Sequence, residues 1–207
     1  MTLQNMEKGI LAGGETGVVE GQALYHDGTG ALVTCGISDE YHFAGFCHII
    51  TDGEAASVVY LYAEGDVGQA LGDGANAYTV GQMVQLGAAG VIVQYTPIRS
   101  YDHTVSAAEE AVDTITVDPN VSHIVALTNS GAGGGQAGDY LINGNGGTLA
   151  GSDVNQELDD TLDFLNPNIQ ENDILTIDYI PKRGAVAKVI ADANIGDPVY
   201  VKTLNYQ

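Results

Sequence analysis

The chain has little positive charge, little sulfur and no tryptophan. Six Lys and Arg residues stand against 27 Asp and Glu residues, which gives a formal net charge of -21. A field of that sign repels phosphate backbones and anionic lipids, so direct binding to nucleic acid or to a membrane is disfavoured. Two cysteines are too few for the disulfide framework of a secreted protein, and we expect Cys35 and Cys47 to be free, half-buried thiols rather than a bridge.

Long hydrophobic runs are also lacking. No segment approaches the roughly 18 apolar residues of a membrane span. The opening sequence MTLQNMEKGILAGG has neither the charged leader nor the apolar run of a signal peptide, so we expect synthesis in the cytoplasm. Hydrophobic residues nevertheless make up 44% of the chain and occur in short stretches between 28 glycines, a pattern that predicts a mainly β protein with many tight turns.

Glycine recurs at a fixed spacing. Three segments open on a glycine and carry a second one nine positions later, at Gly21/Gly30, Gly81/Gly90 and Gly138/Gly147. Each segment has the pattern of a strand, a turn and a returning strand. The first glycine permits a sharp entry into the strand, and the second permits a positive φ after the turn.

The pattern of residue types changes along the sequence and divides the chain into four parts. Residues 1–14 are sparse in apolar side chains and indicate a flexible arm. Residues 15–96 hold closely spaced strand patterns and predict a small β-barrel or sandwich. Residues 97–166 predict an inserted α+β segment, and residues 167–207 a β ending that either completes the first module or belongs to a second.

Two short helices are expected within the insertion. Ser106 and Glu109 have the capping-box spacing that begins a helix, predicted near 107–113. A second helix is predicted over 154–165, closed by Pro167, because apolar residues fall on one helical face at Val154, Leu158, Leu162 and Leu165.

No catalytic motif emerges from the spacing of reactive residues, and we predict neither a cofactor nor a metal. Gly133, Gly135 and Gly138 fit Gly-x-Gly-x-x-Gly, but a strand pattern follows, where dinucleotide binding needs the N-terminus of a helix. Five side chains of the types that zinc prefers lie within 23 residues at a spacing that matches no zinc module: His26, Cys35, His42, Cys47 and His48. A cation bound by a loop stays open as an alternative.

Tyrosine and the basic residues give hints of a contact surface. Eleven tyrosines against three phenylalanines suit a partly wet interface, although strand tyrosines with solvated hydroxyls explain them equally. Four of the six basic residues fall in the last 26 positions, at Lys182, Arg183, Lys188 and Lys202. They either face something acidic or locally balance Asp192 and Asp197.

Residues 17–94 resemble the small β-barrel decoration (cement) proteins of tailed-bacteriophage capsids, with a weaker echo at 171–203. The resemblance lies in GQALYHDGTGALV, in the Phe-x-Gly and Gly-x-Val strands of YHFAGFCHIITDGEAASVVYLYAEGDV, and in VGQMVQLGAAGVIVQ. It implies a protein without a catalytic role that binds the major capsid protein on the virion surface, often as a homotrimer. The insertion departs from the compact form of that family.

The least repelled regions of so acidic a chain should make the first contacts with a capsid, with the arm gaining order as it docks. The candidate contact residues are Leu3, Ile10, Leu11, Lys182 and Arg183. One alternative is a receptor- or glycan-binding module of a phage fibre, with aromatic side chains presented on loops. Another is a hydrolase whose His and Asp residues converge only in the folded chain.

Overall fold

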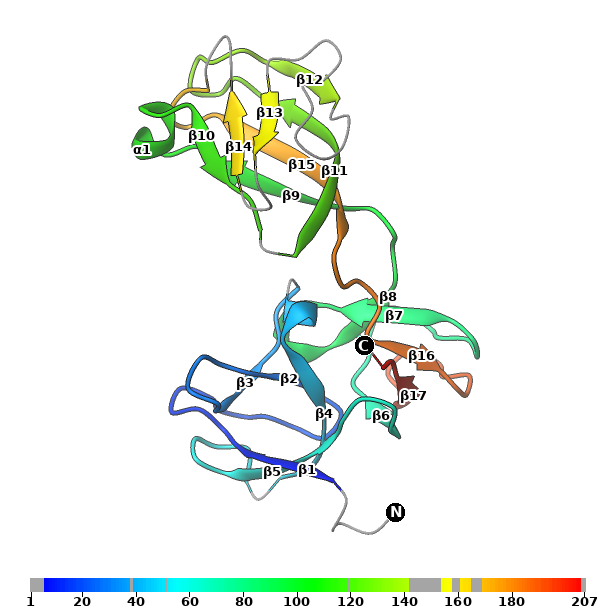
Figure 1. Ribbon diagram of the computed structural model, residues 1–207. Coiled ribbons are helices and arrows are strands. Elements are labelled where there is room, and N and C mark those ends of the chain that lie inside the picture. The colour runs from blue at the N-terminus through cyan, green and yellow to red at the C-terminus, as the bar shows by residue number, and fades with distance from the viewer. Residues whose placement is uncertain are drawn as a thin grey trace. The chain divides into compact units, whose positions relative to one another are not determined.

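The computed structural model describes residues 6–37, 39–50, 52–118, 120–141, 154–157, 161–164 and 169–205. The chain folds into two compact units (Figure 1). Unit 1 comprises Met1–Thr96 and Arg183–Gln207, and unit 2 comprises Pro97–Lys182. The fold is mainly β, with several antiparallel sheets. Unit 2 extends beyond the expected end of the insertion at 166, and the chain returns to unit 1 only at Arg183.

Unit 1 contains two five-stranded sheets. The first has the order β1-β5-β4-β2-β3, with β1 Glu7–Ile10, β2 Ala23–His26, β3 Leu32–Thr34, β4 Phe43–Ile50 and β5 Val58–Tyr62. The second has the order β6-β17-β16-β7-β8, with β6 Val67–Ala70, β7 Met83–Leu86, β8 Ile92–Gln94, β16 Ala187–Val189 and β17 Val199–Thr203. Two short 3-10 turns, η2 Asp39–Tyr41 and η3 Ala88–Gly90, connect strands. The C-terminal segment thus supplies two strands of the second sheet.

The first sheet is buried on both faces. Ala23 of β2 belongs to a cluster that also takes Phe46 of β4 and Val84 and Val201 of the second sheet. The next residue, Leu24, points to the opposite face and packs in a separate cluster with Leu11, Leu32, Cys47, Val59 and Leu61. Successive strand residues point to opposite faces, so both faces are lined by apolar side chains.

Within the described residues, one four-residue turn that ends on an acid or an amide occurs five times just before a strand. Its third residue has a positive φ, and its fourth residue donates a backbone N–H to the carbonyl of the first, as in a type II turn. The five turns are 19–22, 63–66, 79–82, 170–173 and 194–197, and they precede β2, β6, β7, β15 and β17. We call them the strand-entry turns.

A side chain closes each strand-entry turn a second time. Gln22, Asp66, Gln82 and Asp173 each accept the backbone N–H of the turn's first residue at 3.0–3.1 Å. In the fifth turn the carboxylate of Asp197 accepts the side-chain amide of Asn194 at 3.1 Å. An acid or amide at the fourth position therefore satisfies a donor that the turn would otherwise leave to water.

The glycine spacing in the first two repeats has a clear structural basis. Gly21 and Gly81 have φ of 84° and 90° and are the third residues of strand-entry turns. Gly30 and Gly90 have φ of 84° and 70° where the chain turns back. The β2–β3 and β7–β8 hairpins have the same register, since the pair Leu24/Thr34 recurs 60 positions later as Val84/Gln94. Gly138 begins β12, whereas Gly147 lies outside the described residues.

Unit 2 contains a four-stranded and a three-stranded sheet. The first has the order β12-β11-β15-β9, with β9 Arg99–Thr104, β11 Val121–Asn129, β12 Gly138–Leu141 and β15 Ile174–Pro181. The second has the order β10-β14-β13, with β10 Thr114–Thr116, β13 Val154–Glu157 and β14 Thr161–Phe164. One core holds both sheets together, and it includes Ile115, Ile124, Leu162, Phe164 and Ile177.

The predicted helix over 154–165 is wrong. Residues 154–157 and 161–164 form β13 and β14, which pair antiparallel from Val154/Phe164 to Glu157/Thr161. In β14 the buried Leu162 and Phe164 alternate with Thr161 and Asp163, the period of two that suits a strand. Two of the four residues that were expected to form the apolar face of this helix, Leu158 and Leu165, lie outside the described residues.

The other expected helix is a single turn, α1 Ala107–Glu110. The Ser106 and Glu109 capping box is formed, with side chain and backbone bonded in both directions. Within the described residues, no helix is long and apolar enough to cross a membrane.

The N-terminal arm is not flexible over its whole length. Glu7–Ile10 form β1, which pairs with β5 from Glu7/Leu61 to Ile10/Val58. Leu11 follows and is only 2% exposed. The segment is sparse in apolar residues because an edge strand needs few of them, and backbone pairing together with one buried leucine holds it in unit 1.

Candidate functional site

The five predicted contact residues differ in their exposure. Ile10 is 54% exposed at the end of β1, whereas Leu11 is buried in the core and is wrong as a contact residue. Leu3 lies outside the described residues. Lys182 is exposed at the end of unit 2, and Arg183 is half-buried and forms an ion pair with Glu64.

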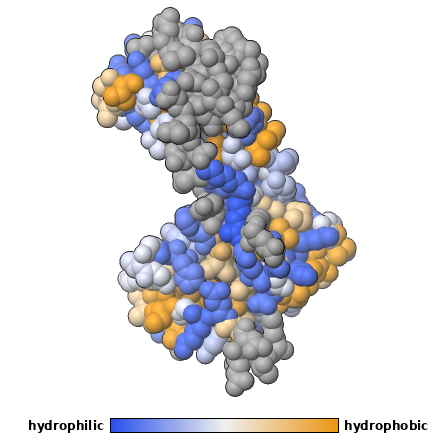
Figure 2. All heavy atoms as spheres, viewed as in Figure 1, coloured by the Kyte–Doolittle hydropathy of each residue, from blue (hydrophilic) through white to orange (hydrophobic). Residues whose placement is uncertain are grey.

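Exposed apolar side chains are distributed over both units. Figure 2 shows hydrophobic residues scattered among hydrophilic ones on the visible face. Two of the most exposed, Val80 and Ile195, are the second residues of strand-entry turns, at 62% and 61% exposure. A backbone bridge between Tyr78 and Ala193 joins the segments before these two turns.

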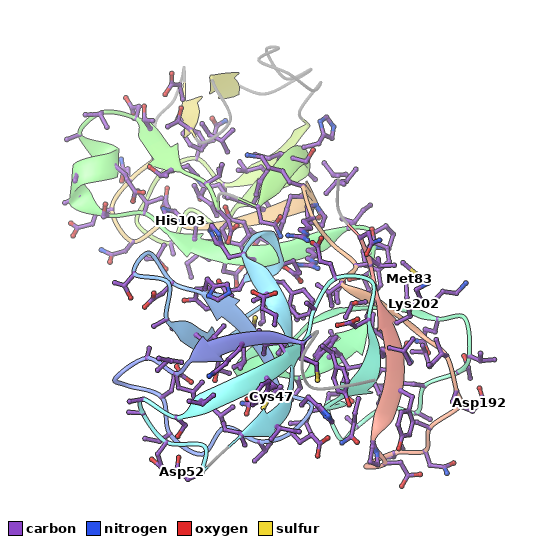
Figure 3. The ribbon with its side chains drawn as sticks, turned by 60° about the horizontal axis from the view of Figure 1, so that its bottom comes forward. Cys47, Asp52, Met83, His103, Asp192 and Lys202 are labelled. Carbon is purple, nitrogen blue, oxygen red and sulfur yellow. The ribbon has the colours of Figure 1, made fainter. Side chains whose placement is uncertain are left out.

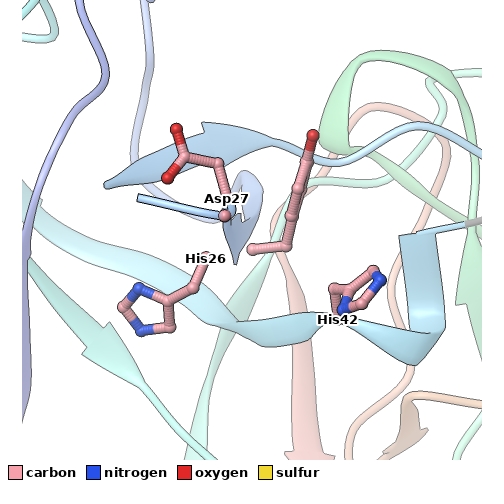
Figure 4. Close-up of a pocket in the computed structure, with 5 residues that line it drawn as sticks. His26, Asp27 and His42 are labelled. Atoms are coloured by element: carbon pink, nitrogen blue, oxygen red, sulfur yellow. The ribbon is translucent and has the colours of Figure 1, made fainter. Parts of the chain in front are cut away.

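Unit 1 carries an open pocket of about 370 Å³. It is lined by Tyr25, His26, Asp27, Gly28 and His42. Figure 4 shows Asp27 and, on the same side of it, the imidazole rings of His26 and His42, which are well separated from each other. The ring centroids of Tyr25 and His42 lie 6.3 Å apart. An aromatic ring beside polar groups suits a neutral polar ligand, such as a sugar, better than an anion.

The polar groups of this pocket are held by local bonds. The Oδ1 atom of Asp27 accepts the backbone N–H groups of Thr29 and Ala31 at 2.8 and 2.9 Å and the Thr29 hydroxyl at 2.7 Å. The hydroxyl bond from Thr29, followed by its backbone bond, lowers the pKa of Asp27. His26 Nε2 lies 3.0 Å from Glu7 Oε1, and its Nδ1 lies 3.2 Å from the Gly30 carbonyl.

Tyr25 is a poor base in this setting. Burial, and then the negative charge of Asp39 nearby, raises the pKa of its phenol. The phenol therefore stays protonated at neutral pH and acts as a hydrogen-bonding group and a flat apolar surface. The pocket has the features of a binding site rather than those of a nucleophile paired with a base.

The candidate zinc ligands are not brought together. Within the described residues, no group of three or more His, Cys, Asp or Glu side chains could hold a metal ion. Cys35 and Cys47 are free thiols, as expected, but they are fully rather than half buried and belong to different core clusters. Burial raises the pKa of both thiols, that of Cys47 to about 12. His48 instead lies 3.3 Å from Glu20 and stacks near Tyr62.

The Gly-rich loop in unit 2 surrounds a carboxylate of the protein itself. Asp173 is fully buried and accepts the N–H groups of Gly133 at 2.7 Å and Gly135 at 3.3 Å. It also accepts the Gln170 N–H at 3.0 Å and the Asn129 side-chain amide at 3.1 Å. A Cβ on Gly135 would lie 2.0 Å from Asp173 Oδ2. The glycines thus permit the backbone to approach an internal anion, in the place where a dinucleotide motif would hold phosphate.

No known protein family, curated protein or solved structure matches the chain.

Sequence analysis missed the pocket and the role of Asp173. Tyr25 and His42 are 17 positions apart and meet only because β2 pairs with β4. Asp173 was one of many acids, and its importance depends on a loop about 40 positions earlier. The available signal was the spacing Gln-Glu-Asn-Asp at 170–173, which has the turn pattern of Ala-Glu-Gly-Asp at 63–66.

Proposed function

We propose that the protein is a non-enzymatic structural protein of a tailed-phage virion. It binds the surface of the assembled capsid, contacts the major capsid protein and stabilises the contacts between capsid subunits. It is made in the host cytoplasm and self-associates as a homotrimer. Many weak contacts repeated by symmetry then provide the binding free energy without any reactive group.

The observation that carries this proposal is the place of the resembling residues in the fold. Gly21 leads into β2, Phe43 and Gly45 begin β4, Gly65 precedes β6, and Gly81 leads into β7. These positions all fall in unit 1, and the echo in the C-terminal segment supplies β16 and β17 of the same unit. A Cβ on Gly45 would lie 2.5 Å from the Tyr62 carbonyl, so the Phe-x-Gly pattern reflects close packing of β5 on β4.

The same proposal includes the finer architecture of unit 1. Its two sheets contribute to a shared core, in which the rings of Phe43 and Phe46 lie 5.0 Å apart and contact residues of the second sheet. The described strands form open sheets and no closed barrel, so we take this pair of sheets to be the sandwich form of the predicted module. β16 and β17 complete it.

The acids of the chain support a structural role. Asp52 accepts the Ser57 hydroxyl and the Glu54 N–H. Asp73 accepts two backbone N–H groups, the Asn76 amide and the Tyr78 hydroxyl. With Asp27 and Asp173, these carboxylates hold turns and loops in place, which is what a static binding scaffold requires.

The test is direct imaging. Purified protein is mixed with capsids assembled without it, from the phage whose genome encodes this chain, and the product is reconstructed by electron cryomicroscopy. We expect extra density at symmetric positions on the outer surface. Bare capsids at a saturating concentration of the protein would overturn the proposal.

The pocket at Tyr25 favours a second candidate, a glycan-binding module of a phage fibre. In that case Tyr25→Ala abolishes binding on an array of bacterial surface glycans, while the protein stays folded and keeps its oligomeric state. Tyr95→Ala, at a half-buried tyrosine outside the pocket, is the control. Absence of any glycan signal from the wild-type protein would eliminate this candidate.

A further inference from the structure

Two of the chain's six basic residues lie directly opposite each other on an exposed sheet face. Lys188 of β16 pairs with Lys202 of β17, and both side chains are exposed. Lys188 also lies opposite Met83 of β7, and Lys202 lies opposite Val67 of β6. Figure 3 labels Met83 and Lys202 near each other on this sheet. One row of side chains thus runs across four strands in the order Val67, Lys202, Lys188, Met83.

Apolar side chains extend this face. Tyr200 points to the same side as Lys202, since the exposed and buried residues of β17 alternate, and it is 51% exposed. Val67 is 49% exposed, and Ile190, two residues beyond Lys188, is 40% exposed. We call Val67, Met83, Lys188, Ile190, Tyr200 and Lys202 the lysine face. Apolar side chains around a pair of cations are typical of a contact surface.

The lysines have no acidic partner in the part of the chain that the structure describes. The ion pairs there involve His26, His48, His103 and Arg183. Asp192 and Asp197 are the acids that could balance the C-terminal lysines, but their carboxylates accept hydrogen bonds from turn residues instead. The first accepts the Val80 N–H at 2.7 Å, and the second accepts the Asn194 amide.

This arrangement is unfavourable in the isolated chain. Like charges directly opposite each other destabilise a pair of antiparallel strands. With 27 acids and six bases, a charged residue opposite either lysine would by composition usually be an acid. The lysine pair lowers the stability of the folded chain and has no counter-charge within it. An acidic surface of a binding partner would explain why the pair is present.

We propose that the lysine face binds the acidic surface of a second copy of this chain. The copy offers the required chemistry, since its net charge is -21 and its exposed surface includes both acids and apolar side chains. Two lysine faces cannot meet each other, because that would bring four cations together. The contact is therefore heterologous, from the lysine face of one copy to a different, acid-rich surface of the next, and such contacts close into a ring when the rotation between copies allows it, as in the proposed homotrimer.

The inference rests on the self-association in the proposed function, but it needs no capsid. Sedimentation velocity on the purified wild-type chain, at protein concentrations from about 1 to about 200 µM, is the measurement. We expect a concentration-dependent oligomer. The charge-reversal variant Lys188→Glu/Lys202→Glu should weaken association at least about a hundredfold, since each reversal changes one attraction into a repulsion.

The matched control is Lys8→Glu/Lys182→Glu. It makes the same change in net charge at two exposed lysines outside the lysine face. We expect it to leave the oligomer within about twofold of the wild type, because general repulsion between copies is screened beyond about 8 Å at physiological salt. Equal loss in both variants would assign the effect to net charge and overturn the proposal.

A single variant separates docking from folding. Lys188→Glu places an acid opposite Lys202, so we expect its unfolding temperature to rise by about 1–2 °C while association weakens. A variant that both unfolds earlier and dissociates would indicate a structural role for Lys188 and would contradict the proposal.

Carbodiimide coupling, which joins lysine amines to carboxylates in contact, identifies the acceptor. We expect links between copies from Lys188 or Lys202, and none from Lys8. A wild-type chain that is monomeric throughout, and whose lysine-face variants lose capsid binding, would assign this face to the capsid and refute the second copy as its partner. Capsid binding without self-association would leave the proposed capsid binding standing, while this inference and the proposed self-association both fail.

Discussion

The two units build the same strand-entry turn from different residues and use it differently. Among the described residues, unit 1 has four turns of this kind that end on an acid or an amide, each with a glycine at the positive φ, and their fourth residues lie at or near the surface. Unit 2 has one, with Asn172 at a φ of 68° and the fully buried Asp173 at the fourth position. The local sequence therefore determines the shape of the turn. How much the turn contributes to stability depends on the further hydrogen bonds that the fourth side chain accepts.

Burial makes Asp173 the most consequential acid in this comparison. Burial alone would raise its pKa, but hydrogen bonds from Gln170, Asn129, Gly133 and Gly135 outweigh that effect and hold the pKa below its usual value. In unit 1, by comparison, the half-buried Asp66 accepts one backbone N–H, that of Ala63 at 3.1 Å.

The largest expected effect is therefore the contrast between Asp173→Ala and Asp66→Ala. Removing Asp173 leaves several buried donors without an acceptor, which should lower the free energy of unfolding of unit 2 by at least about 3 kcal/mol. Asp66→Ala should cost unit 1 about 1 kcal/mol. Hydrogen exchange followed for each unit separately measures both, and similar losses in the two variants would remove the distinction between the turns.

The pH dependence sharpens the same contrast. The unfolded chain has an aspartate pKa of about 3.9, and that of Asp173 in the folded protein is lower. Its stabilisation is thus fully present above about pH 4 and is lost as the pH falls through the folded pKa. The difference in unfolding free energy between wild type and Asp173→Asn should shrink below pH 4, because asparagine does not titrate. A difference that is constant from pH 6 to pH 3 would contradict this assignment.

Glycine-to-alanine substitutions in unit 1 test how closely other backbone atoms approach each strand-entry turn. A Cβ on Gly21 would lie 2.9 Å from the backbone nitrogen of Leu71, whereas a Cβ on Gly196 would have nothing within 4 Å. Gly196→Ala should cost about 1–2 kcal/mol for the positive φ alone. Gly21→Ala should cost more, because backbone atoms must also move. Urea denaturation of both variants gives the comparison, and an equal cost would mean that the backbone of Leu71 shifts freely.

The smallest effect is expected at Asn172. Asparagine tolerates the left-handed region, so Asn172→Gly should change the free energy of unfolding by less than about 0.5 kcal/mol. Asn172→Ala should cost about 1 kcal/mol. A large gain in stability from the glycine would show that unit 2 stores strain at this turn, which the comparison with unit 1 does not predict.

The repeated glycines were predictable because a positive φ is a local property. Gly21, Gly30, Gly81 and Gly90 have the backbone conformations that their spacing indicated. The mainly β class also followed from composition and alternation.

Elements whose identity depends on distant partners were not predictable. Leu162 fits both a helical face and an inward strand position, and only the pairing of β14 with β10 and β13 decides between them. Glu7–Ile10 has a single large apolar side chain, that of Ile10, and its strand forms on the edge that β5 provides. The lysine face is likewise hidden in the sequence, since Lys188 and Lys202 become neighbours only through the register of β16 and β17.

The central claim is that the protein stabilises an assembled capsid, and the most direct measurement is the temperature at which capsids come apart. Capsids that lack the protein are heated with and without a saturating amount of it, and disassembly is followed by light scattering. We expect the disassembly temperature to rise by several degrees with the protein bound. An unchanged disassembly temperature, with the protein shown to be bound, would contradict it.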